Sequence, residues 1–168
     1  EYFECNQFIG TLEIPNSVIS IGHHAFHGCT KLTGSLIIPD SVQKIGDYAF
    51  AECSGFNGTL TLPNSLTQIN TYAFYRCSGF QCQLILPNSI KTIESYAFSE
   101  CSQFSGELKL PTTLTTIGSN SFDRCYKLCG KLIIPNSVTL IDSYAFYDCH
   151  RFNGSLEIPD SVATIRSH

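Results

Sequence analysis

Cysteine offers the most chemistry in this chain, and its spacing is regular. Seven of the nine cysteines recur every 24 residues, namely Cys5, Cys29, Cys53, Cys77, Cys101, Cys125 and Cys149. If successive units stack as paired strands do, neighbouring cysteines lie ~4.8 Å apart, a separation that a disulfide tolerates. The series nevertheless stands beside phenylalanines, and free cysteine is among the most buried residue types. We therefore expect structural core thiols.

Two further cysteines, Cys82 and Cys129, fall outside this series. They stand in neighbouring positions of the repeat but about two units apart, which is too far for a bridge between them. The local bridges that remain are Cys77–Cys82 and Cys125–Cys129. Because nine is an odd number, at least one thiol is unpaired or reaches outside the chain.

Three histidines cluster in one unit, at His23, His24 and His27. His23 and His27 are four residues apart and share a face if the segment is helical, and Asp47 stands one unit after His23. Two imidazoles and a carboxylate could bind zinc. Other units carry other residue types at these positions, so we interpret the cluster as variation at exposed sites and expect no metal and no cofactor.

No catalytic constellation is visible elsewhere. The sequence has no glycine-rich phosphate loop, nucleophile elbow or pair of carboxylates that stands out from the repeat, so we expect no enzymatic activity. Asn57-Gly58-Thr59 and Asn153-Gly154-Ser155 match the N-glycosylation sequon, which matters only if a eukaryotic secretory pathway makes the protein.

The charge pattern excludes some classes of partner. Net charge is −4, and the basic residues are scattered singly, so no basic stripe for nucleic acid exists. No apolar run approaches the ~18 residues of a membrane span. The chain opens inside a repeat and has no signal peptide at its start.

The whole chain is built on one repeat. All seven prolines are 24 residues apart, at Pro15, Pro39, Pro63, Pro87, Pro111, Pro135 and Pro159. A fixed period of this length is typical of a solenoid. We expect a single solenoid over residues 1–168, of about seven units, uncapped at both ends and part of a longer protein.

The unit that begins at Gly34 predicts two walls. Leu36 and Ile38 alternate with outward residues, as in a short strand with one buried face. Pro39 lacks an N–H and ends the strand, and Asp40-Ser41 turns a corner through side-chain bonds to the backbone.

The rest of the unit is expected to form the opposite wall and to close the coil. Val42 and Ile45 predict a second short extended run. Gly46 is suited to a bend with positive φ. Residues 48–53 place Ala, Phe and Cys as on a single helical turn, and Phe56 fills the last corner.

The repeated string Ile38-Pro39, Ser41-Val42, Ile45-Gly46, Ala49-Phe50 and Cys53 resembles the BspA-like leucine-rich repeat of bacterial and protist surface proteins. The resemblance implies an α/β repeat solenoid. It is a right-handed horseshoe with a parallel β-sheet on the concave side and short extended and single-turn helical segments on the convex side. It also implies adhesion to host proteins and cells. The period of 24 departs from the more usual 23, and the added residue is the glycine before the strand.

A tyrosine column, Tyr48, Tyr72, Tyr96 and Tyr144, allows two interpretations. It could be an aromatic binding stripe. It could also be a stacking ladder that flanks the core with its hydroxyls in water, which is the interpretation we favour.

The outward positions of the first strand are where we place recognition, because they vary between units whereas the buried positions do not. The expected ligand-binding residues are Ile37, Thr59, Thr61, Gln83, Ile85, Glu107, Lys109, Lys131 and Ile133. Exposed isoleucines can mark an interaction site, although isoleucine also has a high strand propensity.

These features predict a secreted or cell-surface scaffold for adhesion, which binds a host-cell or matrix protein through its concave sheet. The alternative is a structural stalk that presents other domains. Neither prediction involves nucleic acid or membrane insertion, and both allow end-to-end packing through the uncapped repeats.

Overall fold

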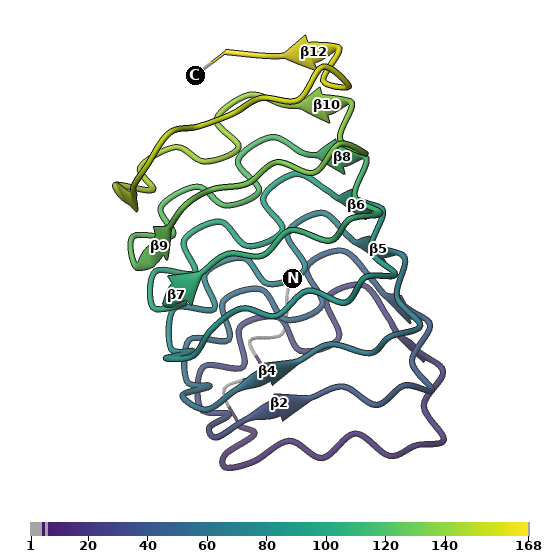
Figure 1. Ribbon diagram of the computed structural model, residues 1–168. Coiled ribbons are helices and arrows are strands. Elements are labelled where there is room, and N and C mark those ends of the chain that lie inside the picture. Colours follow the sequence, from purple (N-terminus) through teal and green to yellow (C-terminus); the bar gives the residue numbers. More distant parts are fainter. Residues whose placement is uncertain (1–4, 6, 168) are drawn as a thin grey trace.

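The computed structural model describes Cys5 and residues 7–167, which wind into a continuous stack of coils (Figure 1). The described residues form short strands and turns and contain no helix, and therefore no helix that could cross a membrane. The strands are β1 (Ser20–Ile21), β2 (Leu36–Ile37), β3 (Lys44–Ile45), β4 (Leu60–Thr61), β5 (Gln68–Ile69), β6 (Thr92–Ile93), β7 (Gly106–Glu107), β8 (Thr116–Ile117), β9 (Leu128–Gly130), β10 (Leu140–Ile141), β11 (Arg151–Phe152) and β12 (Thr164–Ile165).

All strand pairs are parallel, and the pairing shows that the coil is the repeat. On the wall that carries the strand after the proline, Ile21 pairs with Ile45 and Ile93 with Ile117, each 24 residues on. We call this the second wall. It holds the pair β1–β3 and the five-stranded sheet β5–β6–β8–β10–β12, seen along one side of Figure 1.

The wall that precedes the proline, here the first wall, has less continuous pairing. It contains the pair β2–β4 and isolated bridges between Ile85 and Lys109 and between Ile133 and Glu157. A third ladder, β7–β9–β11, joins the loops that lead into the first wall. The predicted parallel solenoid of 24-residue units is therefore confirmed, and its longest sheet lies on the second wall.

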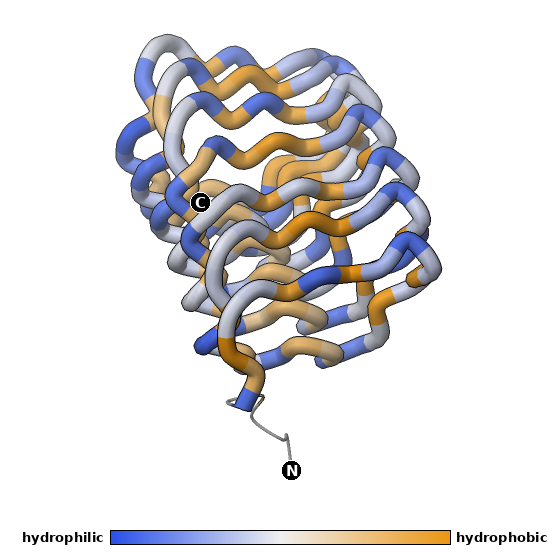
Figure 2. The backbone as a smooth tube through the Cα atoms, turned by 90° about the horizontal axis from the view of Figure 1, so that it is seen from below, coloured by the Kyte–Doolittle hydropathy of each residue, from blue (hydrophilic) through white to orange (hydrophobic). Residues whose placement is uncertain are grey.

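The core is one apolar column that runs through all coils. Figure 2 shows hydrophobic residues recurring at the same place in successive coils. Six phenylalanine rings stack with centroids 5.2 to 5.7 Å apart and planes within 12°, namely Phe26, Phe50, Phe74, Phe98, Phe122 and Phe146. No coil can cover such a column alone, so each depends on its neighbours for burial.

The predicted single-turn helix is wrong. In the segment 48–53, the N–H groups of Tyr48, Phe50 and Glu52 donate to carbonyls of the next coil. The N–H groups of Ala49, Ala51 and Cys53 instead close tight turns to the residue three before. An α-helical turn bonds each N–H to the carbonyl four residues before it and needs negative φ throughout, so bonding between coils here replaces helical bonding.

The backbone of this segment also corrects the expectation for Gly46. Positive φ occurs on either side of the phenylalanine, at Tyr48 (57°) and Glu52 (62°) and at the equivalent residues of other coils, but not at Gly46. Gly46 serves close approach instead, because a Cβ there would lie 2.5 Å from the backbone nitrogen of His23.

Candidate functional site

The strand positions of the first wall alternate between core and solvent, as the sequence pattern predicts. Leu36 and Ile38 have exposed fractions of 0% and 2%, whereas Ile37 between them is 59% exposed. The pleat therefore presents one side chain in two to solvent.

All nine residues expected to bind a ligand are exposed on this wall. We call them the first-wall face: Ile37, Thr59, Thr61, Gln83, Ile85, Glu107, Lys109, Lys131 and Ile133. The register brings them together, since Ile37 pairs with Thr61, and Ile85 with Lys109. Isoleucine is usually buried in proteins, yet Ile85 is 68% exposed, the largest exposed fraction of the three isoleucines on this face.

Polar groups of the face contact one another and a neighbouring residue, Glu157. Gln83 Nε2 donates to the Glu107 carbonyl at 2.8 Å, and Lys131 Nζ lies 3.3 Å from a carboxylate oxygen of Glu157. Lys109 Nζ is 3.8 Å from the Glu107 carboxylate, and its side chain remains 76% exposed. Because exposed ion pairs of this kind contribute little to stability, these charges are available to a partner.

The face is hollowed at two places that are equivalent in the repeat. One hollow of about 330 Å³ lies around Ile85 and Lys109 and reaches Pro111. The other, of about 480 Å³, lies around Ile133 and Glu157. The two are two coils apart, so the face carries the same feature twice.

The cysteine column packs in the core or against it, and its first two members are bridged. Cys53, Cys77, Cys101 and Cys125 are free and buried, in agreement with the prediction of core thiols, but Cys5 and Cys29 form a disulfide with Cα atoms 4.5 Å apart. This pair corrects the expectation for the first two members of the series.

The local bridges considered for Cys82 and Cys129 do not form, and both of these cysteines are free and partly exposed. The bridge that does form joins the same position of two adjacent coils, Cys5 and Cys29.

The buried thiols are poor nucleophiles. Burial raises the pKa of Cys77, Cys101 and Cys125 well above 9.0, because the desolvated thiolate is disfavoured. Each thiol instead donates to a phenylalanine carbonyl of the preceding coil, as Cys101 Sγ does to Phe74 O at 2.9 Å. Their role is therefore to link coils.

The histidine cluster takes part in packing between coils. His23 Nδ1 accepts the Asp47 backbone N–H at 3.0 Å. His24 stacks on Tyr48 at 4.7 Å, and His27 meets His24 edge-on at 5.5 Å. Burial and the neighbouring histidines lower the pKa of His24. Among the described residues, no three His, Cys, Asp or Glu side chains are arranged to hold a metal ion, so His23, His27 and Asp47 do not form the zinc site considered above.

Tyr48, Tyr72 and Tyr96 of the tyrosine column form a stacking ladder. Tyr48 and Tyr72, and Tyr72 and Tyr96, have ring centroids 4.5 Å apart and planes within 8°. This stacking agrees with the interpretation of the column as a ladder that flanks the core.

One column of charged residues was not predicted from the sequence. Residues Glu52, Arg76, Glu100, Arg124 and Asp148 form a column of alternating charge. Arg76 lies 2.9 Å from Glu100 and 3.5 Å from Glu52, and Arg124 continues the series at 3.8 Å from Glu100. The 24-residue spacing of opposite charges was visible in the sequence and could have revealed this charge ladder.

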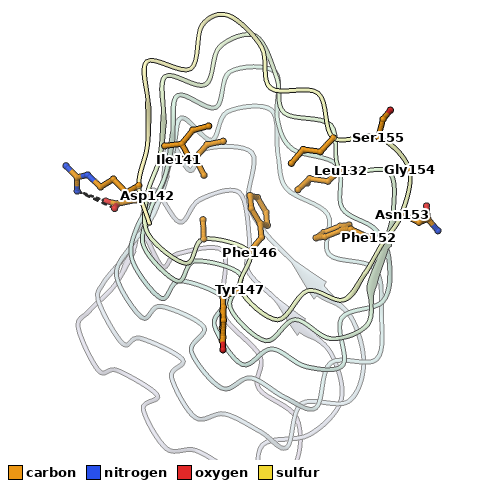
Figure 3. Close-up of a pocket in the computed structure, with 13 residues that line it drawn as sticks. Leu132, Ile141, Asp142, Phe146, Tyr147, Phe152, Asn153, Gly154 and Ser155 are labelled. Carbon is orange, nitrogen blue, oxygen red and sulfur yellow. Dashed lines mark hydrogen bonds and ion pairs between the residues drawn. The ribbon is translucent and has the colours of Figure 1, made fainter. Parts of the chain in front are cut away.

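A cavity of about 450 Å³ opens at the C-terminal end of the stack (Figure 3). Ile141, Phe146 and Phe152 point into it, whereas Asn153 of the second sequon points away from the coil. In this last coil Leu156 is 58% exposed, against 9% for Leu132 one coil earlier. The cavity is the end of the core column and not a separate site.

Comparison with known proteins agrees with this architecture. A family model described as BspA type leucine rich repeat region matches residues 1–129 and 81–168, in six copies. No curated protein matches the chain.

Three solved structures are similar. A leucine rich repeat protein of T. pallidum is 30% identical with a TM-score of 0.71, over 80% of this chain and 61% of that one. A leucine rich cell surface protein of Faecalibacterium prausnitzii is 27% identical with a TM-score of 0.58, over 86% and 32% of the two chains. A leucine-rich repeat protein of Bacteroides ovatus is 26% identical with a TM-score of 0.67, over 94% and 47%.

This chain therefore spans less than two thirds of the length of each of those proteins. The family match covers the whole sequence. The chain belongs to the BspA type leucine rich repeat family.

Proposed function

We propose that this chain is a surface-exposed or secreted scaffold that binds a host-cell or matrix protein through the first-wall face. The observation that carries the proposal is the exposure of Ile37, Ile85 and Ile133, although the residues on either side of each are buried. Apolar side chains rimmed by polar groups mark interaction sites. Membership of the family and the neighbour described as a cell surface protein support the location.

The mechanism is recognition by a preorganised surface. Bonding between coils and the stacked core fix the backbone beneath the face, so little conformational entropy is lost when a partner binds. The chain's part in binding is to position side chains, and the proposal assigns it no catalytic step.

A structural stalk is the second candidate, and one observation favours it. Polar residues of the first wall pair with each other, as Thr59 N–H does with Ser35 Oγ at 3.0 Å and Lys131 with Glu157. In a spacer, polar side chains can bond to one another in this way and no binding partner is needed. End-to-end contact between repeats would also cover the exposed apolar residues of the last coil.

The test is surface plasmon resonance of the chain on immobilised fibronectin, fibrinogen, laminin and collagen. The test variant combines Ile85→Asp with Lys109→Glu. Ile19→Asp is the matched control, because Ile19 is 61% exposed on the second wall. We expect the double variant to bind a captured matrix protein at least about tenfold more weakly. Its melting temperature should stay within about 2 °C of the parent, because all the changed residues are exposed.

Two results would count against the proposal. Binding that survives both the double variant and Ile37→Asp would exclude the first-wall face as the site. Failure to bind any of the four matrix proteins would favour the spacer.

A further inference from the structure

We propose that the partner segment that docks on the first-wall face is an amphipathic α-helix lying along the solenoid axis. The helix presents two apolar residues at i and i+7, with an acidic residue between them at i+3 or i+4. This inference rests on the proposed function and names the chemistry of the partner.

Two exposed isoleucines supply the apolar anchor points. Ile85 and Ile133 are 68% and 57% exposed, each beside a hollow, and each in the same position of its coil. They are two coils apart, which corresponds to roughly 10 Å along the axis at ~4.8 Å per coil. Apolar residues that insert into neighbouring pockets are the usual energetic centres of an interface.

Lys109 supplies the charge between these anchors. It stands in the same column as Ile85 and Ile133, on the coil between them, and pairs with Ile85 across a bridge. Its side chain is 76% exposed, and its contact with Glu107 is long, at 3.8 Å. A carboxylate from a partner can therefore approach the ammonium group without breaking a buried ion pair.

A helix matches this arrangement better than other backbones. Residues i and i+7 of an α-helix are ~10.5 Å apart on one face, and i+3 and i+4 lie midway between them on that face. Side chains on one face of a β-strand recur at ~6.8 and ~13.6 Å. A polyproline II segment places i and i+3 at ~9.3 Å, but the two residues between them point elsewhere and leave Lys109 without a partner.

The test titrates the chain, labelled with ¹³C at isoleucine methyls, with synthetic peptides. The probe is a lactam-bridged helix of about five turns with leucines at i and i+7 and glutamates at i+3 and i+4. A peptide of the same composition has its leucines at i and i+4, and a proline-rich peptide has leucines at i and i+3. A fourth peptide is the probe with lysines in place of the two glutamates.

We expect the probe to give saturable shifts at Ile85 and Ile133 and to bind about tenfold more tightly than either spacing control, which corresponds to about 1.4 kcal/mol. Lys109→Glu should weaken the probe about tenfold and favour the lysine peptide instead. Lys91→Glu is the matched control, an exposed lysine of the other wall, and should change neither affinity.

Each other outcome overturns the inference. An axial helix with a central acid would be excluded if a spacing control bound as tightly as the probe or more tightly. It would also be excluded if the shifts mapped to other isoleucines, or if Lys109→Glu left the affinity of the probe unchanged. Matrix-protein binding that the Ile85→Asp/Lys109→Glu variant loses would leave the proposed function standing even then, so the two failures are distinguishable.

Discussion

Single side chains in the core act through their neighbours above and below. Phe74 is fully buried and stacks between Phe50 at 5.6 Å and Phe98 at 5.4 Å. Its removal opens a cavity shared by three coils, which the surrounding ladder cannot close without breaking its spacing.

Phe74→Ala should therefore lower the free energy of unfolding by about 3–5 kcal/mol. Urea denaturation followed by circular dichroism measures the change. Phe8→Ala is the control, since Phe8 is 59% exposed, and should cost less than about 1 kcal/mol. Equal losses for the two variants would contradict a continuous core column.

The buried thiols predict a pH dependence of stability. Their pKa in the folded chain is raised above the ordinary 9.0 by desolvation, to about 12 at Cys53 and Cys149. A raised folded pKa gives a contribution that is fully present below pH 9 and is lost as the pH rises towards the folded value. The free energy of unfolding should therefore fall above pH 9.

Urea titrations from neutral pH to about 10.5 measure this loss. Cys101→Ala should show a weaker pH dependence than the parent, because one buried thiol no longer ionises on unfolding. Cys82→Ala removes a partly exposed thiol and should retain the parental dependence. A Cys101 variant with an unchanged slope would show that these thiols do not couple to folding.

At the scale of the strand and turn, bonding between coils overrides local preference. Tyr48 and Glu52 adopt the left-handed conformation although neither residue type favours it. Their N–H groups donate to the next coil, and this bond holds each strained backbone in place.

Two glycines at the same position of successive coils test how closely the coils approach. A Cβ at Gly46 would lie 2.5 Å from the backbone of His23, whereas a Cβ at Gly22 meets nothing within 4 Å. Neither glycine has a positive φ. Gly46→Ala should cost about 1–3 kcal/mol of stability, and Gly22→Ala should be neutral within about 0.5 kcal/mol. Thermal unfolding measures both variants, and equal losses of stability would refute the packing argument.

At the scale of the whole molecule, the coil is the unit that can be added or removed. Deleting residues 82–105 joins equivalent positions of the repeat and should leave a folded, shorter solenoid, because each coil contacts only its neighbours. The same deletion places Arg76 beside Arg124 in the charge ladder. Salt should therefore stabilise this variant more than the parent, by less than about 1 kcal/mol.

Two matched deletions sharpen this prediction. Deleting residues 58–105 removes two coils and restores alternation, with Glu52 beside Arg124, so the extra response to salt should disappear. Deleting residues 94–105 removes half a coil and puts core positions out of register, so cooperative unfolding should be lost. Circular dichroism melts at low and high salt measure all three variants, and a folded half-coil deletion would contradict the register.

Much of this architecture follows from the sequence alone. Period-two alternation places Leu36 and Ile38 in the core and Ile37 on the surface, and the apolar pair Val42 and Ile45 is placed in the core because it recurs in every unit. The nine residues of the first-wall face are predicted because the outward positions vary between units whereas the buried positions do not. Their role as a binding site remains a prediction, because exposure shows availability and does not show a partner.

Only the tertiary structure decided how the coils bond to each other. The turn at residues 48–53 looked helical because its apolar spacing fits a helix, but its donors go to another coil 24 residues away. The Cys5–Cys29 bridge likewise depends on which thiols stacking brings into contact. Side-chain period is a local property that a sequence displays directly, whereas the choice of hydrogen-bond and thiol partners is made between coils once they are stacked.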